Sequence, residues 1–213
     1  MLEFNTRGRE KDPEILVILF HGYGANGDDL LNLAEYWARD HVPSAKILCP
    51  SAPHLLYGTE PRMRSLQWFD LGDYSPEVMA GELQECSLIV EQFIRTQLEK
   101  NRLPYDKLIL SGFSQGAMLS LYLGLFGLPQ QPLGVLSYSG AYFMGAAKHR
   151  PRVLLVHGDA DEVVSVEACH RADRILKDNS VPSRVIVEPG VGHCITNRGR
   201  DLGGKFLREV LSL

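Results

Sequence analysis

The sequence has 213 residues, of which 45% are hydrophobic and 23% are charged, and its formal net charge is −4. This length and composition predict one folded domain over residues 1–213 and argue against long disordered regions. The sequence has no run of five or six basic residues, so it indicates no nucleic-acid partner.

Short apolar runs alternate with longer segments of helical periodicity. The first run, Ile15–Phe20, has six apolar residues without polar alternation, which is typical of a strand covered on both faces of a sheet. Further strands are predicted at 46–48, 107–110, 133–136, 153–156 and 184–187. Helices are predicted at 28–40, 76–101, 115–126, 166–177 and 198–211. This order predicts an α/β fold with a mostly parallel central sheet and helices on both faces.

Residues 50–76 fit neither pattern, because they carry four prolines and no clean hydrophobic period. An irregular segment of this length is uncommon in a compact domain unless it has a function, such as lining a binding site. Ligand pockets are mostly apolar, so the apolar residues of this segment are candidates for a substrate pocket. These candidates are Leu55, Leu56, Trp68 and Phe69. The alternative is a loop that folds onto the core.

The strongest local motif is Gly112-Phe113-Ser114-Gln115-Gly116, between a predicted strand and a predicted helix. In this context G-x-S-x-G predicts a sharp turn that presents Ser114 as a nucleophile, with glycines where side chains would collide. The alternative is a purely structural turn, which the two flanking elements make the weaker interpretation. A serine hydroxyl also needs a base, and the base needs an orienting acid.

His193 and Asp161 are the candidates for base and acid. Asp161 follows the predicted strand at 153–156 and His193 follows the one at 184–187, in the chain order serine, acid, histidine that this fold uses. The carboxyl ends of parallel strands meet at one edge of a sheet, so these side chains are expected to converge with Ser114. Asp159 is the rival acid, although an acid at that place often bonds backbone amides in the turn.

The other histidines are weaker candidates for the base. His157 opens the turn that contains Asp161 and is interpreted as a structural hydrogen-bonding residue. Four more, in polar or helical surroundings, are predicted to lie at the surface. These are His41, His54, His149 and His170.

Acyl transfer also requires hydrogen-bond donors for the developing oxyanion. The backbone N–H of Gln115 is one candidate, and the backbone N–H of Tyr23, in the loop after the first strand, is the other. The alternative for this loop is a phosphate-binding site, because residues 22–27 also match G-x-G-x-x-G. A nucleotide site usually has an acid at the end of the next strand, where this sequence has Cys49-Pro50.

Six short motifs occur in a consistent order. They are LFHGYG (19–24), PSAP (50–53), WFD (68–70), GFSQG (112–116), HGDAD (157–161) and GH (192–193). Together they resemble the phospholipase/carboxylesterase family, which includes the acyl-protein thioesterases, from about residue 14 to the C-terminus. The resemblance implies an α/β-hydrolase fold without a large cap domain and without a cofactor. By motif position it also implies the Ser114, Asp161 and His193 triad and the Tyr23 and Gln115 oxyanion hole.

Members of this family cleave carboxylic esters, and some cleave lysophospholipids or fatty-acyl thioesters on proteins. The resemblance therefore implies a small or lipid-like ester, or an acylated protein, as the substrate. It also implies a homodimer, because many members form dimers. The expected function is a serine carboxylesterase that works through an acyl-enzyme intermediate.

Two other classes of function stay open. A non-catalytic receptor on this fold would bind a small ligand in the same cleft, but it would have less reason to keep every catalytic group. A serine peptidase on this fold usually has an extra domain that restricts access, and 213 residues leave no room for one. Reaction with a serine-directed probe and the rate of amide hydrolysis would separate these classes.

The sequence also bears on location and on metals. Residues 1–14 are MLEFNTRGREKDPE, with charges where a signal peptide needs an apolar stretch. No apolar run approaches the roughly 18 residues that span a bilayer, so no stable membrane insertion is expected. The four cysteines are scattered without a C-x-x-C pair, which argues against disulfides and against a zinc site. These features predict a cytoplasmic protein without a bound metal.

Overall fold

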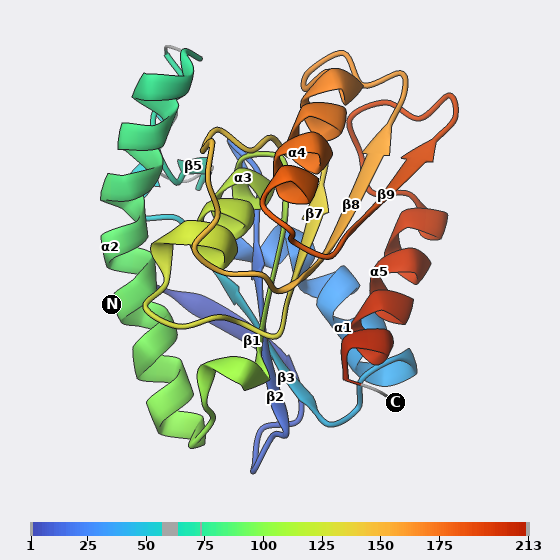
Figure 1. Cartoon of the computed structure of the whole chain (residues 1–213). Coiled ribbons are helices and arrows are strands. Elements are labelled where there is room, and N and C mark those ends of the chain that lie inside the picture. The colour runs from blue at the N-terminus through green and yellow to red at the C-terminus, as the bar shows by residue number, and fades with distance from the viewer. Residues whose placement is uncertain (1, 57–63, 73, 212–213) are drawn as a thin grey trace.

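The centre of the molecule is a sheet of seven strands. They are β1 (Phe4–Gly8), β2 (Ile15–Phe20), β3 (Ala45–Pro50), β6 (Leu108–Phe113), β7 (Gly134–Tyr138), β8 (Arg152–Gly158) and β9 (Ser183–Glu188). The computed structural model describes residues 2–56, 64–72 and 74–211, and the strands lie in the order β1-β3-β2-β6-β7-β8-β9 (Figure 1). All neighbours are parallel except β1, which is antiparallel to β3. The predicted α/β fold with a mostly parallel sheet is confirmed.

The sequence analysis does not predict β1. Its residues, FNTRG, are mostly polar, and all of them are half-buried or exposed. A strand at the edge of a sheet bonds to a single neighbour and need not be apolar on both faces. The hydrophobic pattern that identifies the central strands is therefore absent from β1.

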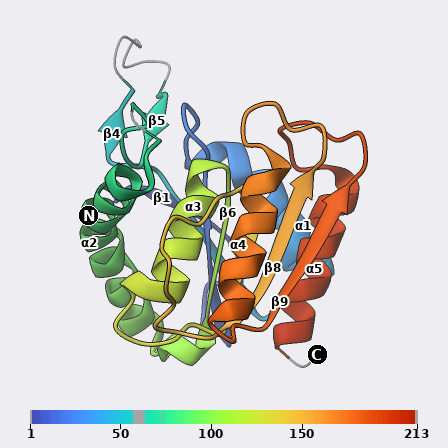
Figure 2. The same ribbon diagram turned by 45° about the horizontal axis from the view of Figure 1, so that its top comes forward.

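In the described part of the chain, five α-helices cover the two faces of the sheet. They are α1 (Leu31–Asp40), α2 (Pro76–Asn101), α3 (Gln115–Tyr122), α4 (Val166–Asp178) and α5 (Asn197–Val210). Helices α1 and α5 pack on one face, and α2, α3 and α4 pack on the other (Figures 1 and 2). Shorter turns are the 3-10 helices η1 (Gly27–Leu30) and η3 (Tyr105–Lys107) and the π-helical turn η4 (Leu123–Gly127).

Two predicted helices differ in extent from the observed ones. The segment predicted as a helix from residue 28 begins with η1, because the Asn26 side chain accepts a hydrogen bond from Asp28 N and caps a 3-10 turn. The segment predicted as a helix over 115–126 ends its α-helical part at Tyr122 and continues as η4. Both differences lie at helix termini, where sequence signals are weakest.

The apolar strands divide their side chains between the two faces. In β2, Leu16, Ile18 and Phe20 join the core beneath α2 and α3. The alternate residues of the strand, Ile15, Val17 and Leu19, join the core beneath α1 and α5. All six are fully buried, because successive side chains of a strand point to opposite faces and helices cover both. This arrangement explains the uninterrupted apolar run.

A small hairpin comes from the irregular segment. It pairs β4 (His54–Leu55) antiparallel with β5 (Leu66–Gln67). In Figure 2 the hairpin lies beside the start of α2, at the same end of the molecule as the loops that follow β8 and β9. Among the described residues, no other inserted element stands between the strands and helices given above, so no large cap domain covers this end.

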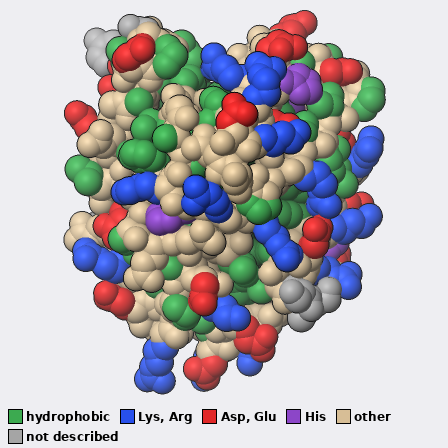
Figure 3. All heavy atoms as spheres, in the orientation of Figure 1, with side chains coloured by type: hydrophobic (Ala, Val, Ile, Leu, Met, Phe, Trp, Pro, Cys, Tyr) green, Lys and Arg blue, Asp and Glu red, His purple; other side chains and the backbone are tan. Residues whose placement is uncertain are grey.

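The surface carries both signs of charge. Lysine and arginine side chains are interspersed with aspartate and glutamate on the face shown in Figure 3. Within residues 2–56, 64–72 and 74–211, no helix is long and apolar enough to cross a membrane. In the same residues, no group of three or more histidine, cysteine, aspartate or glutamate residues is arranged to hold a metal ion.

Candidate active site

Ser114 lies at the sharp turn between β6 and α3. Its backbone has φ 54° and ψ −117°, a conformation that residues other than glycine rarely adopt. The turn is held in place by a hydrogen bond from Ser114 N to Tyr138 O at 2.9 Å. A strained backbone of this kind persists only when its surroundings fix it, and such positions cluster at functional sites.

The two glycines of the motif are required by close packing. A Cβ atom added to Gly112 would lie 2.3 Å from the backbone of Gly116. A Cβ atom added to Gly116 would lie 2.2 Å from the carbonyl oxygen of Phe20, at the end of β2. The turn therefore packs against itself and against the neighbouring strand, which fixes the position of Ser114.

His193 and Asp161 form a hydrogen-bonded pair. His193 Nδ1 donates to Asp161 Oδ2 at 2.8 Å, which leaves Nε2 as the ring atom available to Ser114. The other carboxylate oxygen of Asp161 accepts hydrogen bonds from Val163 N at 3.0 Å and Val164 N at 2.8 Å. The rival acid, Asp159, instead accepts a bond from Gly190 N at 2.6 Å and is exposed.

The surroundings of Asp161 keep its carboxylate charged. Burial acts to raise the pKa of Asp161, but hydrogen bonds from His193, the Val164 amide and Ser139 outweigh burial and lower it. A charged and fixed carboxylate can hold the imidazole in one orientation and stabilise it when it becomes positive. Ser139 has no sequence signal for this role, since it follows β7 and no motif marks it.

The buried histidines near the site are neutral and have other partners. His157 Nε2 donates to Val164 O at 2.7 Å and lies 3.4 Å from Asp161 Oδ2, and burial lowers the pKa of His157. His21 donates through Nδ1 to Gly22 O at 2.7 Å and accepts from Ala52 N through Nε2 at 3.0 Å. Burial lowers the pKa of His21 to about 4. Both rings therefore act as structural groups.

The loop that carries His193 is anchored at both ends. Glu188, the last residue of β9, is 4% exposed and accepts a hydrogen bond from Thr196 Oγ1 at 2.9 Å. Thr196 Oγ1 in turn accepts from Gly199 N at 2.8 Å and caps the start of α5. The strand and the helix that flank the loop are thereby tied together.

Ser114 and His193 line the same cavity, which has a volume of about 380 Å³. Its described lining residues are His21, Gly22, Tyr23, Ala25, Asp29, Leu30, Leu71, Tyr74, Phe113, Ser114, Val163 and His193. The ring of Phe113 packs on the imidazole of His193, with 4.7 Å between the ring centroids. The site is therefore open to a ligand and largely apolar apart from its reactive groups.

The loop after β2 lies directly beside Ser114. A Cβ atom added to Gly22 would lie 3.5 Å from the Ser114 Cβ, so the backbone that leads into Tyr23 is adjacent to the hydroxyl. On the other side of the hydroxyl, Gln115 is the first residue of α3, and N–H groups of a first helical turn lack partners within the helix. The loop after β2 and the start of α3 thus lie on two sides of Ser114.

Residues 66–69 are bonded to the elements on both sides of Ser114. Gln115 Oε1 accepts from Trp68 N at 2.9 Å, and Gln115 Nε2 donates to Phe69 O at 2.7 Å. Trp68 Nε1 donates to His21 O at 2.9 Å, and Gly24 N donates to Leu66 O at 2.8 Å. These bonds are buried or pair backbone with backbone. The segment therefore fixes the loop after β2 relative to α3.

Comparison with known proteins shows the family of this chain. A sequence model of the family described as Phospholipase/Carboxylesterase matches residues 4–210. The chain belongs to this family. It is a carboxylic ester hydrolase with the α/β-hydrolase fold.

The similarity to individual proteins covers almost the whole chain. Acyl-protein thioesterase 1 homolog 1 of Dictyostelium discoideum is 26% identical over 207 residues, which cover 92% of this chain and 90% of that protein. The crystal structure of esterase PE8 has a TM-score of 0.89 and 32% identity and covers 98% of this chain and 99% of that one. Acyl-protein thioesterase 2 of Zea mays has a TM-score of 0.76, 24% identity and coverage of 99% and 100%, and shows the fold alone.

Two expectations, the homodimer and the cytoplasmic location, stay predictions.

The histidines predicted at the surface differ in exposure. Of the four, His54 is exposed, whereas His41, His149 and His170 are half-buried. His149, for example, bonds to Leu128 O through Nε2 at 2.8 Å.

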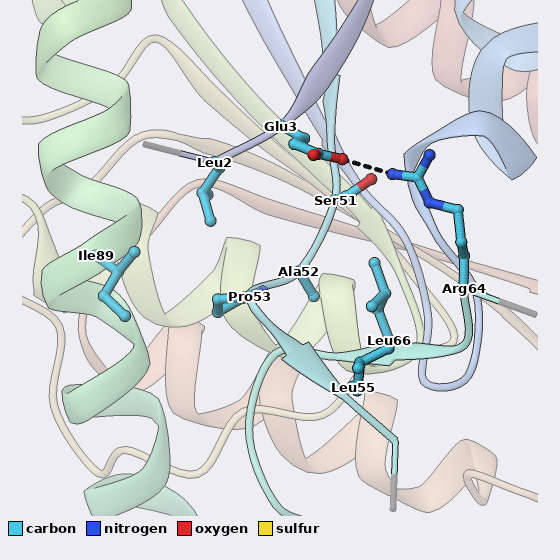
Figure 4. A pocket seen from close by; sticks show the side chains of 9 residues that line it. All are labelled: Leu2, Glu3, Ser51, Ala52, Pro53, Leu55, Arg64, Leu66 and Ile89. Carbon is cyan, nitrogen blue, oxygen red and sulfur yellow. Dashed lines mark hydrogen bonds and ion pairs between the residues drawn. The ribbon is translucent and has the colours of Figure 1, made fainter. Parts of the chain in front are cut away.

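The structure places the four predicted pocket residues outside the Ser114 cavity. Trp68 and Phe69 are 0% and 3% exposed and belong to the core beneath α2. Leu55 is 53% exposed and lines a separate groove of about 630 Å³ between the hairpin and α2 (Figure 4). Leu56 is half-buried and is absent from the lining of the cavity.

The position of these residues outside the Ser114 cavity follows from the path of the irregular segment, and their role in substrate binding stays a prediction. Residues 66–69 turn inward because their backbone and side chains bond to Gln115 and His21. Leu71 and Tyr74, farther along the same segment, line the cavity instead. Asp29 and Val163 also line it, and no sequence motif identifies either.

Proposed function

We propose that this family member hydrolyses carboxylic esters through an acyl-enzyme on Ser114. His193 takes the Ser114 proton as the hydroxyl attacks the ester carbonyl, while Asp161 holds the imidazole and stabilises its charge. The backbone N–H groups of Tyr23 and Gln115 stabilise the oxyanion. His193 then protonates the leaving alcohol or thiol, and water repeats the sequence to release the acid.

The observation that carries this proposal is the hydrogen bond from His193 Nδ1 to the buried Asp161 carboxylate. It fixes the tautomer in which Nε2 is the unprotonated nitrogen, as a general base for serine requires. The ring also lines the cavity that contains Ser114. His21 and His157 are unsuitable as bases because their partners are backbone groups and burial lowers the pKa of each.

The direct test is the kinetics of Ser114→Ala with a p-nitrophenyl ester. The variant should lose kcat by a factor on the order of 10⁴ or more, because it has no nucleophile. Circular dichroism and thermal unfolding of the variant control for the fold. Near-normal hydrolysis by a folded Ser114→Ala protein would reject the assignment.

The two other classes of function are separated by their chemistry. If the protein were a non-catalytic receptor, the wild type would not hydrolyse esters. A serine peptidase predicts turnover of an anilide at a rate comparable with that of the matched ester. The proposed esterase predicts rapid release of p-nitrophenol from the ester and a much slower release of p-nitroaniline from the anilide.

The substrate class that the cavity supports is an ester or thioester with a short or medium acyl chain. A volume of about 380 Å³ lies near the lower end of ligand pockets, which hold about 300–1,000 Å³. A p-nitrophenyl series from acetate to palmitate should therefore give a maximum in kcat/KM well short of palmitate. A rise that continues to palmitate would reject this size limit.

The same series distinguishes the observed lining from the predicted one. Leu71→Ala should lower kcat/KM for the ester with the optimal acyl chain by about fivefold, because the substitution removes an apolar part of the cavity lining. Leu55→Ala is the matched control, since Leu55 lines the other groove, and it should leave the chain-length profile unchanged. The opposite pattern would show that the acyl chain binds in the groove between the hairpin and α2.

A further inference from the structure

Asp29 is an acidic residue that lines the cavity containing Ser114 and His193. Among the described lining residues there is no other carboxylate, and the two imidazoles are those of His21 and His193. No lysine or arginine is among them. The fixed charge of this lining at neutral pH is therefore negative.

The position of the Asp29 carboxylate is set by a local hydrogen bond. Its Oδ2 accepts from Asn26 N at 2.9 Å, and the Asn26 side chain caps the same turn in return. This capping box ties Asp29 to the start of η1, directly after the loop that carries Tyr23. The carboxylate is thus held by backbone structure and has no basic partner in the cavity lining.

The charge of Asp29 is not cancelled by the histidines. His21 is neutral, because burial lowers its pKa to about 4. The Asp29 charge acts in the opposite direction on the pKa of His21, which indicates that its field reaches the wall of the cavity. His193 must be neutral at the start of the reaction to act as a base.

Aromatic side chains also line this cavity. Tyr23, Tyr74 and Phe113 line the same cavity, and the two tyrosines are 45% and 50% exposed at its rim. Aromatic rings attract cations, and proteins use them to recognise quaternary ammonium groups. A carboxylate together with aromatic residues thus favours a positively charged ligand.

We propose that Asp29 makes the Ser114 cavity select esters by charge, favouring cationic over neutral and neutral over anionic substrates. The chemical class is a carboxylic ester or thioester that carries a quaternary or primary ammonium group. This inference rests on the proposed function, because it concerns the substrate of the same nucleophile. Asp29 touches the substrate's charged group and has no part in bond cleavage.

The test compares butyryl thioesters whose thiols differ in charge. Butyrylthiocholine is cationic, 3,3-dimethylbutyl thiobutyrate is its neutral isostere, and S-butyryl-3-mercaptopropionate is anionic. Release of each thiol is followed with the same reagent. A second pair places the charge on the acyl side, with p-nitrophenyl 4-(trimethylammonio)butyrate and p-nitrophenyl 5,5-dimethylhexanoate.

The variant is Asp29→Asn, whose amide oxygen can still accept the hydrogen bond from Asn26 N. The matched control is Asp28→Asn, because Asp28 belongs to the same turn, is absent from the cavity lining and bonds to Asn5 Nδ2. Both variants remove one unit of charge from η1. Thermal unfolding shows whether either substitution disturbs the turn.

The ratio of kcat/KM for cationic and neutral partners should fall by about fivefold in Asp29→Asn, in at least one of the two series. The ratio for Asp28→Asn should stay that of the wild type. The cation preference of the wild type should also weaken at high salt, whereas that of Asp29→Asn should change little, because salt screens an exposed charge.

Equal ratios in the wild type and Asp29→Asn, in both series, would overturn this inference while leaving the esterase assignment intact. An equal fall in Asp28→Asn would also overturn it, because a general change in potential would then explain the effect. Absence of hydrolysis of every ester by the wild type would instead reject the proposed function, and this inference with it.

Discussion

The candidate site combines two regions that differ in how closely the sequence specifies them. Ser114, Asp161 and His193 each follow a parallel strand, and the sheet brings the carboxyl ends of β6, β8 and β9 to one edge. The wall of the cavity also takes Leu71 and Tyr74 from an irregular segment. Regular topology therefore positions the reactive groups, whereas individual hydrogen bonds decide which side chains surround the substrate.

In the strand-end region, the largest effect expected after that of Ser114→Ala comes from the acid. Asp161→Asn should lower kcat by a factor of about 10³–10⁴, because the amide no longer holds His193 in the required tautomer. Asp159→Asn is the matched control, since Asp159 bonds to Gly190 N. It should retain activity within about tenfold, because only the turn is affected. Steady-state kinetics measures kcat for the two variants. Equal losses of kcat would mean that Asp161 cannot be distinguished from Asp159 as the orienting acid.

A second test uses the pH dependence of the free energy of unfolding. It concerns His21, which contacts the irregular segment and lines the same cavity as Ser114. The pKa of His21 is about 4 in the folded protein and about 6.5 in the unfolded chain, so the unfolded chain binds more protons between these values. The stability that His21 contributes is complete above pH 6.5 and is lost as the pH falls towards 4, by about 3 kcal/mol.

Urea denaturation at several pH values measures this loss. The burial of His157 also lowers its pKa and adds a loss of the same sign. His21→Gln should flatten the dependence in this range, although the variant is expected to be less stable at every pH. An unchanged slope in His21→Gln would show that His21 is not the titrating group.

The smallest expected effect concerns the bonds between the irregular segment and the loop after β2. Trp68→Phe removes the donor to His21 O and should cost about 1–3 kcal/mol of stability. It should also lower kcat by about tenfold with little change in KM, because the Tyr23 backbone loses a support.

Trp37→Phe is the control for this effect. Trp37 is equally buried and donates to Arg200 O at 2.8 Å, but it lies in the other core, beneath α1 and α5. It should lose a similar amount of stability and keep its kcat. Equal losses of kcat in the two variants would mean that Trp68 acts only through stability.

Prediction from the sequence succeeded where a feature depends on periodicity or on a motif with a fixed geometry. The apolar run of β2 predicts a buried strand, and G-x-S-x-G predicts the strained turn at Ser114, which the backbone angles show. The edge strand β1 lacks such a pattern, since its polar residues need only one hydrogen-bonded neighbour.

The sequence gives no answer where position depends on contacts between distant residues. Trp68 is apolar and lies in a segment without periodicity, so the sequence cannot distinguish a pocket wall from a core residue. Its inward position follows from bonds to Gln115 and His21, which are 47 residues away on either side of it. The roles of Asp29 and Val163 in the cavity likewise depend on how loops far apart in the chain meet.

The central claim is that Ser114 is the nucleophile, and reaction with a fluorophosphonate probe tests it most directly. Such a probe phosphonylates an activated serine whatever the natural substrate. We predict one phosphonate per chain, located on the peptide that contains Ser114, and no reaction with folded Ser114→Ala. Absence of reaction with the wild type, or a phosphonate on another residue, would contradict the account.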